Sequence, residues 1–369
     1  MKKVLFTATV DSHILAFHLP FLKWFKENGY EVHVATNGNA EIPYCDKKIK
    51  IHFERSPFKL NNIKAIFELR KVLLKEKYDI IHTHTPMGSV VTRLAAKRAR
   101  KHGTRVIYTA HGFHFFKGAP LLNWTLFYPV EKYLSKYTDT LILINKEDYN
   151  LAKKKFKKCI DIQYVPGVGI DENKFNVKMT KKDKHELREI LGLKDTDFVM
   201  IYPAELNKNK NQIMLINVME KLAKKHDNIK LLLPGKDSYN GYYQNLVKEK
   251  GLDNNIFFLG FRQDIPKLLQ ISDLSVATSK REGLPVNIME AMYVGLPIVA
   301  TDCRGQRDLV KNGENGYIIP LNDIEMFSDR IEMIYGNKML RNKLKKVSKK
   351  EVSSYMLKDI LNKMKNIYC

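Results

Sequence analysis

Two carboxylates separated by seven residues are the most informative chemical feature of this chain. They lie in the segment Ser279-Lys-Arg-Glu282-Gly-Leu-Pro285-Val-Asn-Ile-Met-Glu290, which follows an apolar strand pattern and opens a helix pattern. Pro285 suits the first helical position, and the N–H groups between Gly283 and Asn287 would attract an anion such as a diphosphate. We therefore predict that Glu290 accepts hydrogen bonds from ribose hydroxyls and that Glu282 accepts them from a sugar.

The same segment has two other interpretations. The helix dipole favours acidic residues near a helix start, so Glu282 would then only stabilise the helix and Glu290 would lie on a solvated face. A pair of carboxylates is also typical of glycosidases, although the basic surroundings here favour a phosphorylated substrate.

Histidines follow predicted strands in the first half of the chain. His111 comes directly after a strand that ends at Ala110, and ligands of open parallel sheets bind beyond the carboxyl ends of the strands. We predict that His111 contacts a ligand, although a lone histidine is more often structural. His82 and His84 are interpreted as pointing to opposite faces of one strand. We therefore expect no shared metal site, and we expect only His84 to reach the ligand edge.

The loop and early helix after the first strand carry further polar residues. We predict an acceptor-side role for Asp11 or His13 at this position. The sequence contains neither G-x-G-x-x-G after its first strand nor G-x-x-x-x-G-K, which argues against nicotinamide and P-loop enzymes.

These residues must be positioned by a repeated pattern of strands and helices. Short apolar runs alternate with amphipathic helix patterns, which is typical of α/β domains with parallel sheets. The pattern predicts a helix over 15–28, another over 210–226 and a third over 285–294. The pattern restarts after Asp197, and the polar stretch 165–194 is typical of a link between domains. We predict two Rossmann-like, doubly wound domains at 1–170 and 171–352 that face a central cleft, with a C-terminal helix at about 353–369 packing back on the first.

Composition limits the class of protein. The chain has 369 residues, 63 Lys and Arg against 40 Asp and Glu, and a formal net charge of +23. Its four cysteines lie far apart, which favours a reducing, cytoplasmic location. No segment approaches the roughly 18 to 20 apolar residues of a membrane-spanning helix, so we expect at most peripheral membrane contact. No nucleic-acid-binding module is recognisable.

Two features suggest contact with an anionic inner leaflet. The first is cationic charge, since polybasic segments bind anionic lipid. The cationic residues are Arg93, Lys97, Arg98, Arg100 and Lys101 in one helix and Lys153, Lys154, Lys155, Lys157 and Lys158 in another segment. The second is the helix pattern 121–137, whose Trp124, Phe127 and Tyr128 are predicted to dip into the interface. Solvated lysines and a buried aromatic helix are the alternative.

Taken with these motifs, the chain resembles the retaining glycosyltransferases of family 4, which have the GT-B fold. The spacing Glu282-x7-Glu290, with Ala291-Met292 and Gly295-Leu296-Pro297-Ile298-Val299-Ala300-Thr301 after it, is similar to the donor-binding signature of that family. The resemblance extends through Phe17-His-Leu-Pro20 and Val165-Pro-Gly-Val-Gly-Ile-Asp171, and is strongest to bacterial capsule and exopolysaccharide transferases.

The resemblance implies roles for particular residues. Glu290 would hold the ribose, Glu282 the transferred sugar, and the backbone of the segment Gly283, Leu284, Pro285 and Val286 the diphosphate. Lys210 matches the phosphate-binding lysine, and its charge would stabilise the departing UDP. His111 matches the active-site histidine, which would contact the donor sugar near the reacting carbon.

Two departures from the family pattern bear on donor binding. Glu205 stands where many members carry an arginine, so Lys208 or Arg281 would have to supply the second cation. The loop after the first strand lacks the glycines that many members have there.

The resemblance implies a specific reaction. We expect a retaining transfer of a hexose or N-acetylhexosamine from a UDP-sugar to a polyprenyl-diphosphate-linked saccharide at the cytoplasmic face of the membrane. We expect neither a metal nor a cofactor to take part. The alternatives are a UDP-sugar epimerase of the same fold and a non-catalytic, cationic, membrane-associated assembly protein.

Overall fold

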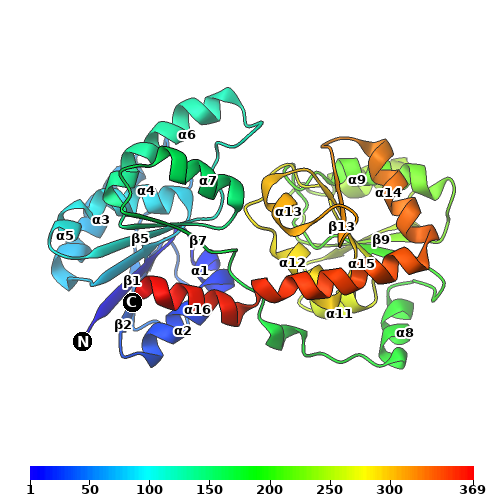
Figure 1. Cartoon of the computed structure of the whole chain (residues 1–369), viewed down its shortest axis with the longest axis horizontal. Helices are drawn as coiled ribbons and strands as arrows, with labels where there is room; N and C mark the ends of the chain where they lie inside the picture. The colour runs from blue at the N-terminus through cyan, green and yellow to red at the C-terminus, as the bar shows by residue number, and fades with distance from the viewer. The chain divides into compact units, whose positions relative to one another are not determined.

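The computed structural model describes all residues, Met1–Cys369, and divides into two compact units. Unit 1 comprises Met1–Val168 together with Ile360–Cys369, and unit 2 comprises Gly169–Asp359 (Figure 1). The predicted boundary after residue 170 lies two residues beyond this division. Each unit contains one parallel sheet with helices packed against it, so the predicted α/β class with two Rossmann-like domains is confirmed.

Unit 1 contains a seven-stranded parallel sheet in the order β3-β2-β1-β4-β5-β6-β7. Its strands are β1 (Lys3–Thr7), β2 (Glu31–Thr36), β3 (Lys47–Lys50), β4 (Ile80–Thr83), β5 (Arg105–Ala110), β6 (Thr140–Leu143) and β7 (Asp161–Tyr164). Its helices are α1 (Asp11–Phe17), α2 (Leu19–Glu27), α3 (Asn61–Glu76), α4 (Pro86–Ala95), α5 (Lys97–Lys101), α6 (Leu121–Leu134) and α7 (Lys146–Lys155), with a short 3-10 helix η1 (Ser135–Tyr137).

Unit 2 contains a six-stranded parallel sheet in the order β10-β9-β8-β11-β12-β13. Its strands are β8 (Phe198–Ile201), β9 (Ile229–Pro234), β10 (Ile256–Gly260), β11 (Leu274–Ala277), β12 (Ile298–Thr301) and β13 (Gly316–Ile319). Its helices are α8 (Lys181–Ile190), α9 (Gln212–Ala223), α10 (Tyr242–Glu249), α11 (Ile265–Gln270), α12 (Val286–Val294), α13 (Arg304–Leu309), α14 (Ile324–Gly336) and α15 (Lys338–Glu351), with the 3-10 helices η2 (Glu172–Phe175) and η3 (Val352–Tyr355).

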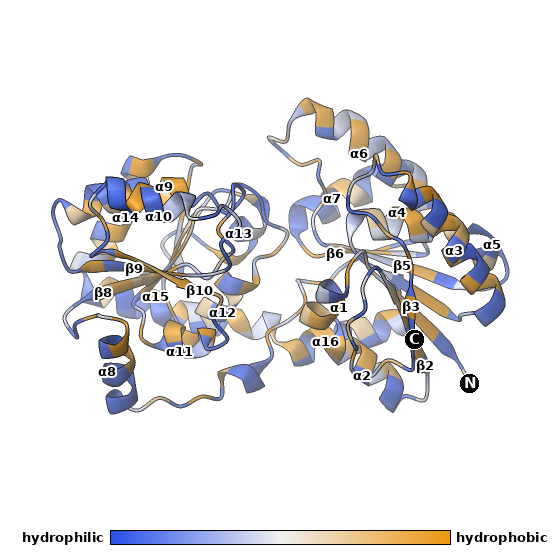
Figure 2. Cartoon of the chain, turned by 180° about the vertical axis from the view of Figure 1, so that it is seen from behind, coloured by the Kyte–Doolittle hydropathy of each residue, from blue (hydrophilic) through white to orange (hydrophobic).

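The central strands are almost entirely buried, and their apolar residues form the cores of both units. Figure 2 shows the strands largely in the hydrophobic colour, whereas the helices alternate between the two. None of the helices combines the length and apolar character that crossing a membrane requires.

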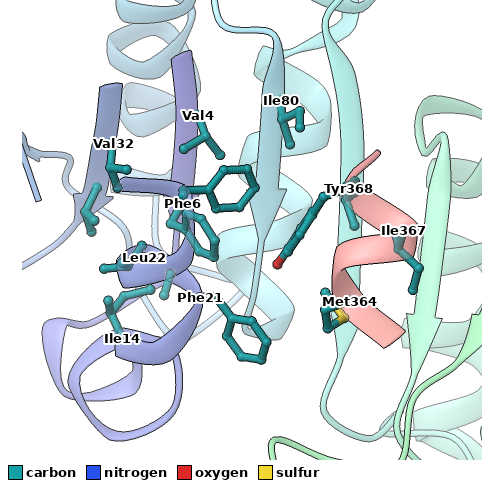
Figure 3. Packing of buried hydrophobic residues seen from close by; sticks show 14 of the residues in the cluster. Val4, Phe6, Ile14, Phe21, Leu22, Val32, Ile80, Met364, Ile367 and Tyr368 are labelled. Atoms are coloured by element: carbon teal, nitrogen blue, oxygen red, sulfur yellow. The ribbon is translucent and has the colours of Figure 1, made fainter. Parts of the chain in front are cut away.

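The last helix, α16 (Leu357–Tyr368), contributes its end to the core of unit 1. Met364, Ile367 and Tyr368 belong to the same buried cluster as Val4 and Phe6 of β1 (Figure 3). The hydroxyl of Tyr368 also lies 2.9 Å from Nδ1 of His82. The chain end thus supplies both apolar contact and a polar partner to a buried imidazole.

Some predicted elements differ from the observed ones. The single helix predicted over 15–28 is two helices that meet at His18, because Pro20 starts a new helix there. The helices predicted from Lys210 and from Pro285 begin at Gln212 and Val286 instead, and Pro285 is the residue before the helix, with φ −74° and ψ 117°. The strands β7 and β13 were not predicted.

Candidate functional sites

In unit 2, two loops that follow neighbouring strands meet through an ion pair. The loop after β8 carries Lys210 and the loop after β11 carries Glu282, and Nζ of Lys210 donates to Oε1 of Glu282 at 2.5 Å. The strands β8 and β11 pair directly in the sheet, so their carboxyl ends bring these residues together across 72 positions of sequence. The two predicted site residues are therefore neighbours.

The carboxylate of Glu282 is held by a second donor. Oγ of Ser279 donates to Oε1 of Glu282 at 2.6 Å, and the Tyr202 hydroxyl lies 2.7 Å from the same Oγ. Tyr202 in turn donates to the backbone carbonyl of Lys210 at 3.2 Å. These bonds fix the orientation of the ion pair before any ligand arrives.

The start of α12 is open to an anion. The N-cap residue Pro285 makes no side-chain cap. The N–H of Ile288 donates to Oδ1 of Asn287 at 3.0 Å, which leaves the N–H groups of Val286 and Asn287 without a side-chain partner. The loop before it is tightly packed, since a Cβ atom added to Gly305 would lie 2.3 Å from the carbonyl oxygen of Gly283. The side chain of Leu284, a residue of this loop, is buried. The backbone before α12 is therefore packed closely against Gly305.

Glu290 lies one turn inside α12 and is half-buried, with no hydrogen-bond partner within the chain. Burial raises the pKa of Glu290 to about 7, and the positive charge of Lys174 offsets this only in part. Glu290 is therefore only partly exposed to solvent. An acceptor group without a partner at such a depth is ready to accept hydrogen bonds from hydroxyl groups.

The remaining predicted donor residues are placed differently from one another. Glu205 is exposed and accepts a hydrogen bond from Ser238. Arg281 is partly buried, and burial, followed by the charge of Arg304, lowers its pKa from the ordinary value. Arg304 donates from Nε to the backbone carbonyl of Glu282 at 3.0 Å.

Arg304 was not predicted as a site residue. The signal was present, because Arg304 follows β12 closely and cations after a strand end lie at the ligand edge. Two guanidinium groups, Arg281 and Arg304, therefore lie near Glu282. Lys208 is exposed and makes no hydrogen bond or ion pair with them.

In unit 1, the carboxylate of Asp11 is fully engaged by hydrogen bonds within the fold. Thr36 and Lys48 both donate to Oδ1 of Asp11, and the backbone N–H of Ala40 donates to Oδ2 at 2.8 Å. Burial alone would raise the pKa of Asp11, but these hydrogen bonds outweigh it and lower the pKa. The geometry does not support an acceptor-side role for Asp11.

Four histidines gather beyond the ends of β1, β4 and β5: His13, His18, His84 and His111. His84 is fully buried, whereas His13 lines the cavity of unit 1 described below. Burial, with a contribution from the charge of Arg55, lowers the pKa of His13 to about 4, and burial holds the pKa of the other three well below the ordinary value. All four imidazoles are therefore neutral at pH 7.

The prediction that His82 and His84 point to opposite faces was wrong. Side chains alternate along a strand with a period of two, so positions i and i+2 share a face. Their ring centroids lie 4.1 Å apart. Both ring nitrogens of His82 nevertheless have hydrogen-bond partners. Nδ1 lies 2.9 Å from the Tyr368 hydroxyl, and Nε2 lies 2.8 Å from the Thr109 hydroxyl.

Unit 1 also contains a cavity of about 600 Å³ whose walls are mainly apolar. Phe17, Met87, Val90, Leu126, Phe127 and Val130 form much of the wall. Polar groups of the lining include those of Arg55, Ser12, His13 and Glu131, and the carboxylate of Glu131 accepts from Arg93 at 2.8 Å. Arg55 was not predicted, although it follows β3 and so lies at the carboxyl edge of the sheet.

The predicted membrane-facing residues are only partly exposed. Arg93 is buried, where it donates to Glu131 at 2.8 Å and stacks over the ring of Tyr108, so its assignment to a surface patch was wrong. Phe115 and Phe156 anchor a core cluster against which Trp124, Phe127 and Tyr128 pack. The exposed apolar residues of α6 are instead Leu121, Leu122, Val130 and Tyr133. The lysines at 153–155, 157 and 158 are exposed.

Comparison with known proteins agrees with this division. Residues 183–351 match the family model described as Glycosyl transferases group 1, and residues 3–145 match the model Glycosyl transferase 4-like. A Bacillus subtilis protein named as a glycosyltransferase, EpsD, is 45% identical over 367 residues, which cover 100% of this chain and 96% of EpsD.

More distant relatives carry more specific names. The UDP-Gal:alpha-D-GlcNAc-diphosphoundecaprenol alpha-1,3-galactosyltransferase of Escherichia coli is 29% identical, over 88% of this chain and 85% of its own length. Among solved structures, Anabaena HepE in complex with UDP and glucose superposes with a TM-score of 0.81 and 21% identity, covering 100% of this chain and 99% of HepE.

Proposed function

Because this chain belongs to the group 1 glycosyltransferases with the GT-B fold, we propose that it transfers a sugar, with retention, from a UDP-sugar to a lipid-linked saccharide. The observation that carries the donor half is in unit 2. There an oriented Lys210–Glu282 pair, an uncapped helix start and a partnerless Glu290 occupy one edge of the sheet. HepE, of the same fold, was solved with UDP.

The donor would use these groups in order along its length. The ionised form of Glu290 accepts hydrogen bonds from the ribose hydroxyls, and the backbone from Gly283 to Val286 receives the diphosphate. Glu282 contacts the transferred sugar. Lys210, with Arg281 as the second cation in place of an arginine at Glu205, stabilises the charge of the departing diphosphate.

Chemistry of this kind needs no nucleophile from the protein. The departing phosphate oxygen accepts the proton of the acceptor hydroxyl as the new bond to the sugar forms on the same face. His111 would contact the donor sugar near the reacting carbon. Since cationic side chains and N–H groups take the place of a metal on the diphosphate, we expect transfer to proceed without a metal or another cofactor.

The acceptor half is proposed for unit 1. Its cavity combines apolar walls with the guanidinium of Arg55, a pairing suited to an isoprenoid chain and the diphosphate that joins it to a saccharide. His13 is the predicted acceptor-side residue that lines this cavity. The Escherichia coli relative is named for an acceptor of this chemistry, GlcNAc-diphosphoundecaprenol. We propose the same class here, in the synthesis of a capsule or exopolysaccharide.

Such an acceptor places the enzyme at the cytoplasmic surface of the membrane. The exposed lysines of 153–158 would contact anionic headgroups, and Leu121 and Leu122 at the start of α6 would enter the interface. Binding would be peripheral.

A product panel tests the transferase proposal. The protein would be incubated with several UDP-sugars, EDTA and lipid-linked saccharides, and UDP, sugar isomers and lipid products would be separated by chromatography. We expect acceptor-dependent UDP release and a heavier lipid product from one donor. An isomerised sugar without a lipid product would instead mean an epimerase, and an unchanged panel would mean a binding protein. The family membership favours neither alternative.

A further inference from the structure

The histidine cluster of unit 1 has more polar groups than its surroundings satisfy. His13, His18, His84 and His111 each place one ring nitrogen within 4.8 Å of those of the other three. Four ring nitrogens are buried with no hydrogen-bond partner, namely Nε2 of His13, both nitrogens of His18 and Nε2 of His84. Within the cluster, Nε2 of His111 lies 3.4 Å from Nδ1 of His84, a long contact.

Buried polar atoms without partners destabilise a fold, because each has lost its hydrogen bonds to water. The neighbouring His82 shows how the fold satisfies an imidazole that serves structure alone, since both its nitrogens have hydroxyl partners. A second group of candidate ligands, Glu31, His33 and Glu76, is likewise already engaged with lysines and a tyrosine. Only the four-histidine cluster keeps several nitrogen atoms unused in one place.

The ring positions approximate a four-coordinate site. With nitrogen ligands about 2 Å from a central zinc ion, four imidazoles in a tetrahedron have ring centres about 5 Å apart. Five of the six ring pairs have centroid distances of 4.7, 5.1, 5.6, 5.7 and 6.0 Å. The rings of the sixth pair, His18 and His84, are stacked with centroids 3.7 Å apart, and these two rings would have to move apart to coordinate the same ion.

We propose that His13, His18, His84 and His111 bind one divalent transition-metal ion, with zinc as the metal whose geometry they fit. The partnerless nitrogens are buried, so the occupant must be small, an ion rather than a sugar. The charge of Arg55 lies near His13 and no carboxylate joins the cluster. Affinity should therefore be lower than in sites built with thiolates.

Metal binding here uses none of the unit 2 residues that we assign to the donor, and it shares only His13 and His111 with the proposed transfer. His111 presents Nε2 to the cluster, which leaves Nδ1 for a substrate. Zinc binding can therefore be measured without any sugar transfer, and either proposal can fail while the other stands.

Calorimetric titration of the metal-free full-length protein with Zn²⁺ tests the site. We expect one equivalent to bind per chain, and we expect His18→Phe, which keeps the aromatic shape, to weaken binding at least about 100-fold. His185→Gln removes an exposed histidine and should leave binding unchanged. Absence of one-equivalent binding, or equal binding by His18→Phe, would overturn the proposal.

A second measurement on the unmodified protein does not depend on how His18→Phe folds. X-ray absorption at the zinc edge should show four nitrogen ligands at about 2.0 Å and no sulfur. A sulfur ligand would place the metal on one of the four cysteines instead, such as the exposed Cys369, and would reject the histidine site.

Discussion

The two units hold polar groups in opposite ways. In unit 2 the charged groups are held by partners within the fold. Lys210 pairs with the carboxylate of Glu282, and Arg304 donates to the backbone carbonyl of Glu282. In unit 1 the cavity is mainly apolar, and the histidines beside it are neutral and largely without partners. Charged groups with fixed positions suit a small, highly charged ligand. An apolar cavity with one guanidinium suits a bulky ligand that carries most of its charge at one point.

The difference has an energetic reason. A charge that must meet a diphosphate is most effective when its position is fixed in advance, because no reorganisation is then needed during reaction. An apolar wall gains free energy simply from the area that it buries. Removing a fixed charge from unit 2 should therefore cost more activity than removing apolar area from the surface of unit 1.

The largest effect is expected from Lys210→Met, which removes the ammonium and keeps the apolar stem. Loss of one preorganised group at the developing charge should lower kcat about 100- to 1,000-fold at saturating donor. Lys208→Met is the matched control, since Lys208 is exposed and two residues away. A kcat within threefold of the unmodified enzyme would remove Lys210 from the reaction.

A smaller effect is expected from titrating Glu290. Burial raises the pKa of Glu290 to about 7, and only the ionised carboxylate serves fully as an acceptor for ribose hydroxyls. Protonation as the pH falls below 7 therefore competes with binding, and UDP affinity should drop about 30-fold between pH 8 and pH 5.5.

Glu290→Gln separates this titration from that of UDP itself. The variant should bind UDP more weakly at pH 8 and lack the part of the pH dependence that belongs to Glu290. Isothermal titration of both proteins across pH 5.5 to 8 gives the comparison, and parallel pH profiles would show that Glu290 does not contact the ligand.

The sequence predicted unit 2 better than unit 1 for a physical reason. Glu282 and Glu290 lie in one continuous strand–loop–helix segment, so local patterns suffice to find them. That Lys210 pairs with Glu282 needed the order of strands in the sheet, which no local pattern gives. The cavity of unit 1 draws residues from loops and helices as far apart as Thr9 and Glu131, so it has no sequence signature.

The errors in the elements have similar causes. The strand β7 reads Asp-Ile-Gln-Tyr and is only partly buried, so it lacks the apolar run that marks a central strand. Arg93 was assigned to a surface because it neighbours other cations, whereas Glu131, 38 residues away, neutralises it inside the unit. Patterns of residue type predicted most strands of both sheets. Which cationic side chains are exposed depends on ion pairs between residues far apart in the sequence, such as Arg93 with Glu131.

The smallest effect is expected at the apolar surface of α6. Leu121 and Leu122 are 78% and 71% exposed at the start of this helix, and burying such side chains in the interface would add to the attraction of the lysines for anionic lipid. Replacing both with serine should weaken binding to anionic vesicles by about three- to tenfold in a sedimentation assay. Leu60→Ser is the control, because Leu60 is 80% exposed in a different part of unit 1. Equal losses in the two variants would mean that α6 is not the part of unit 1 that meets the membrane, and that the exposed lysines alone account for any binding that high salt removes.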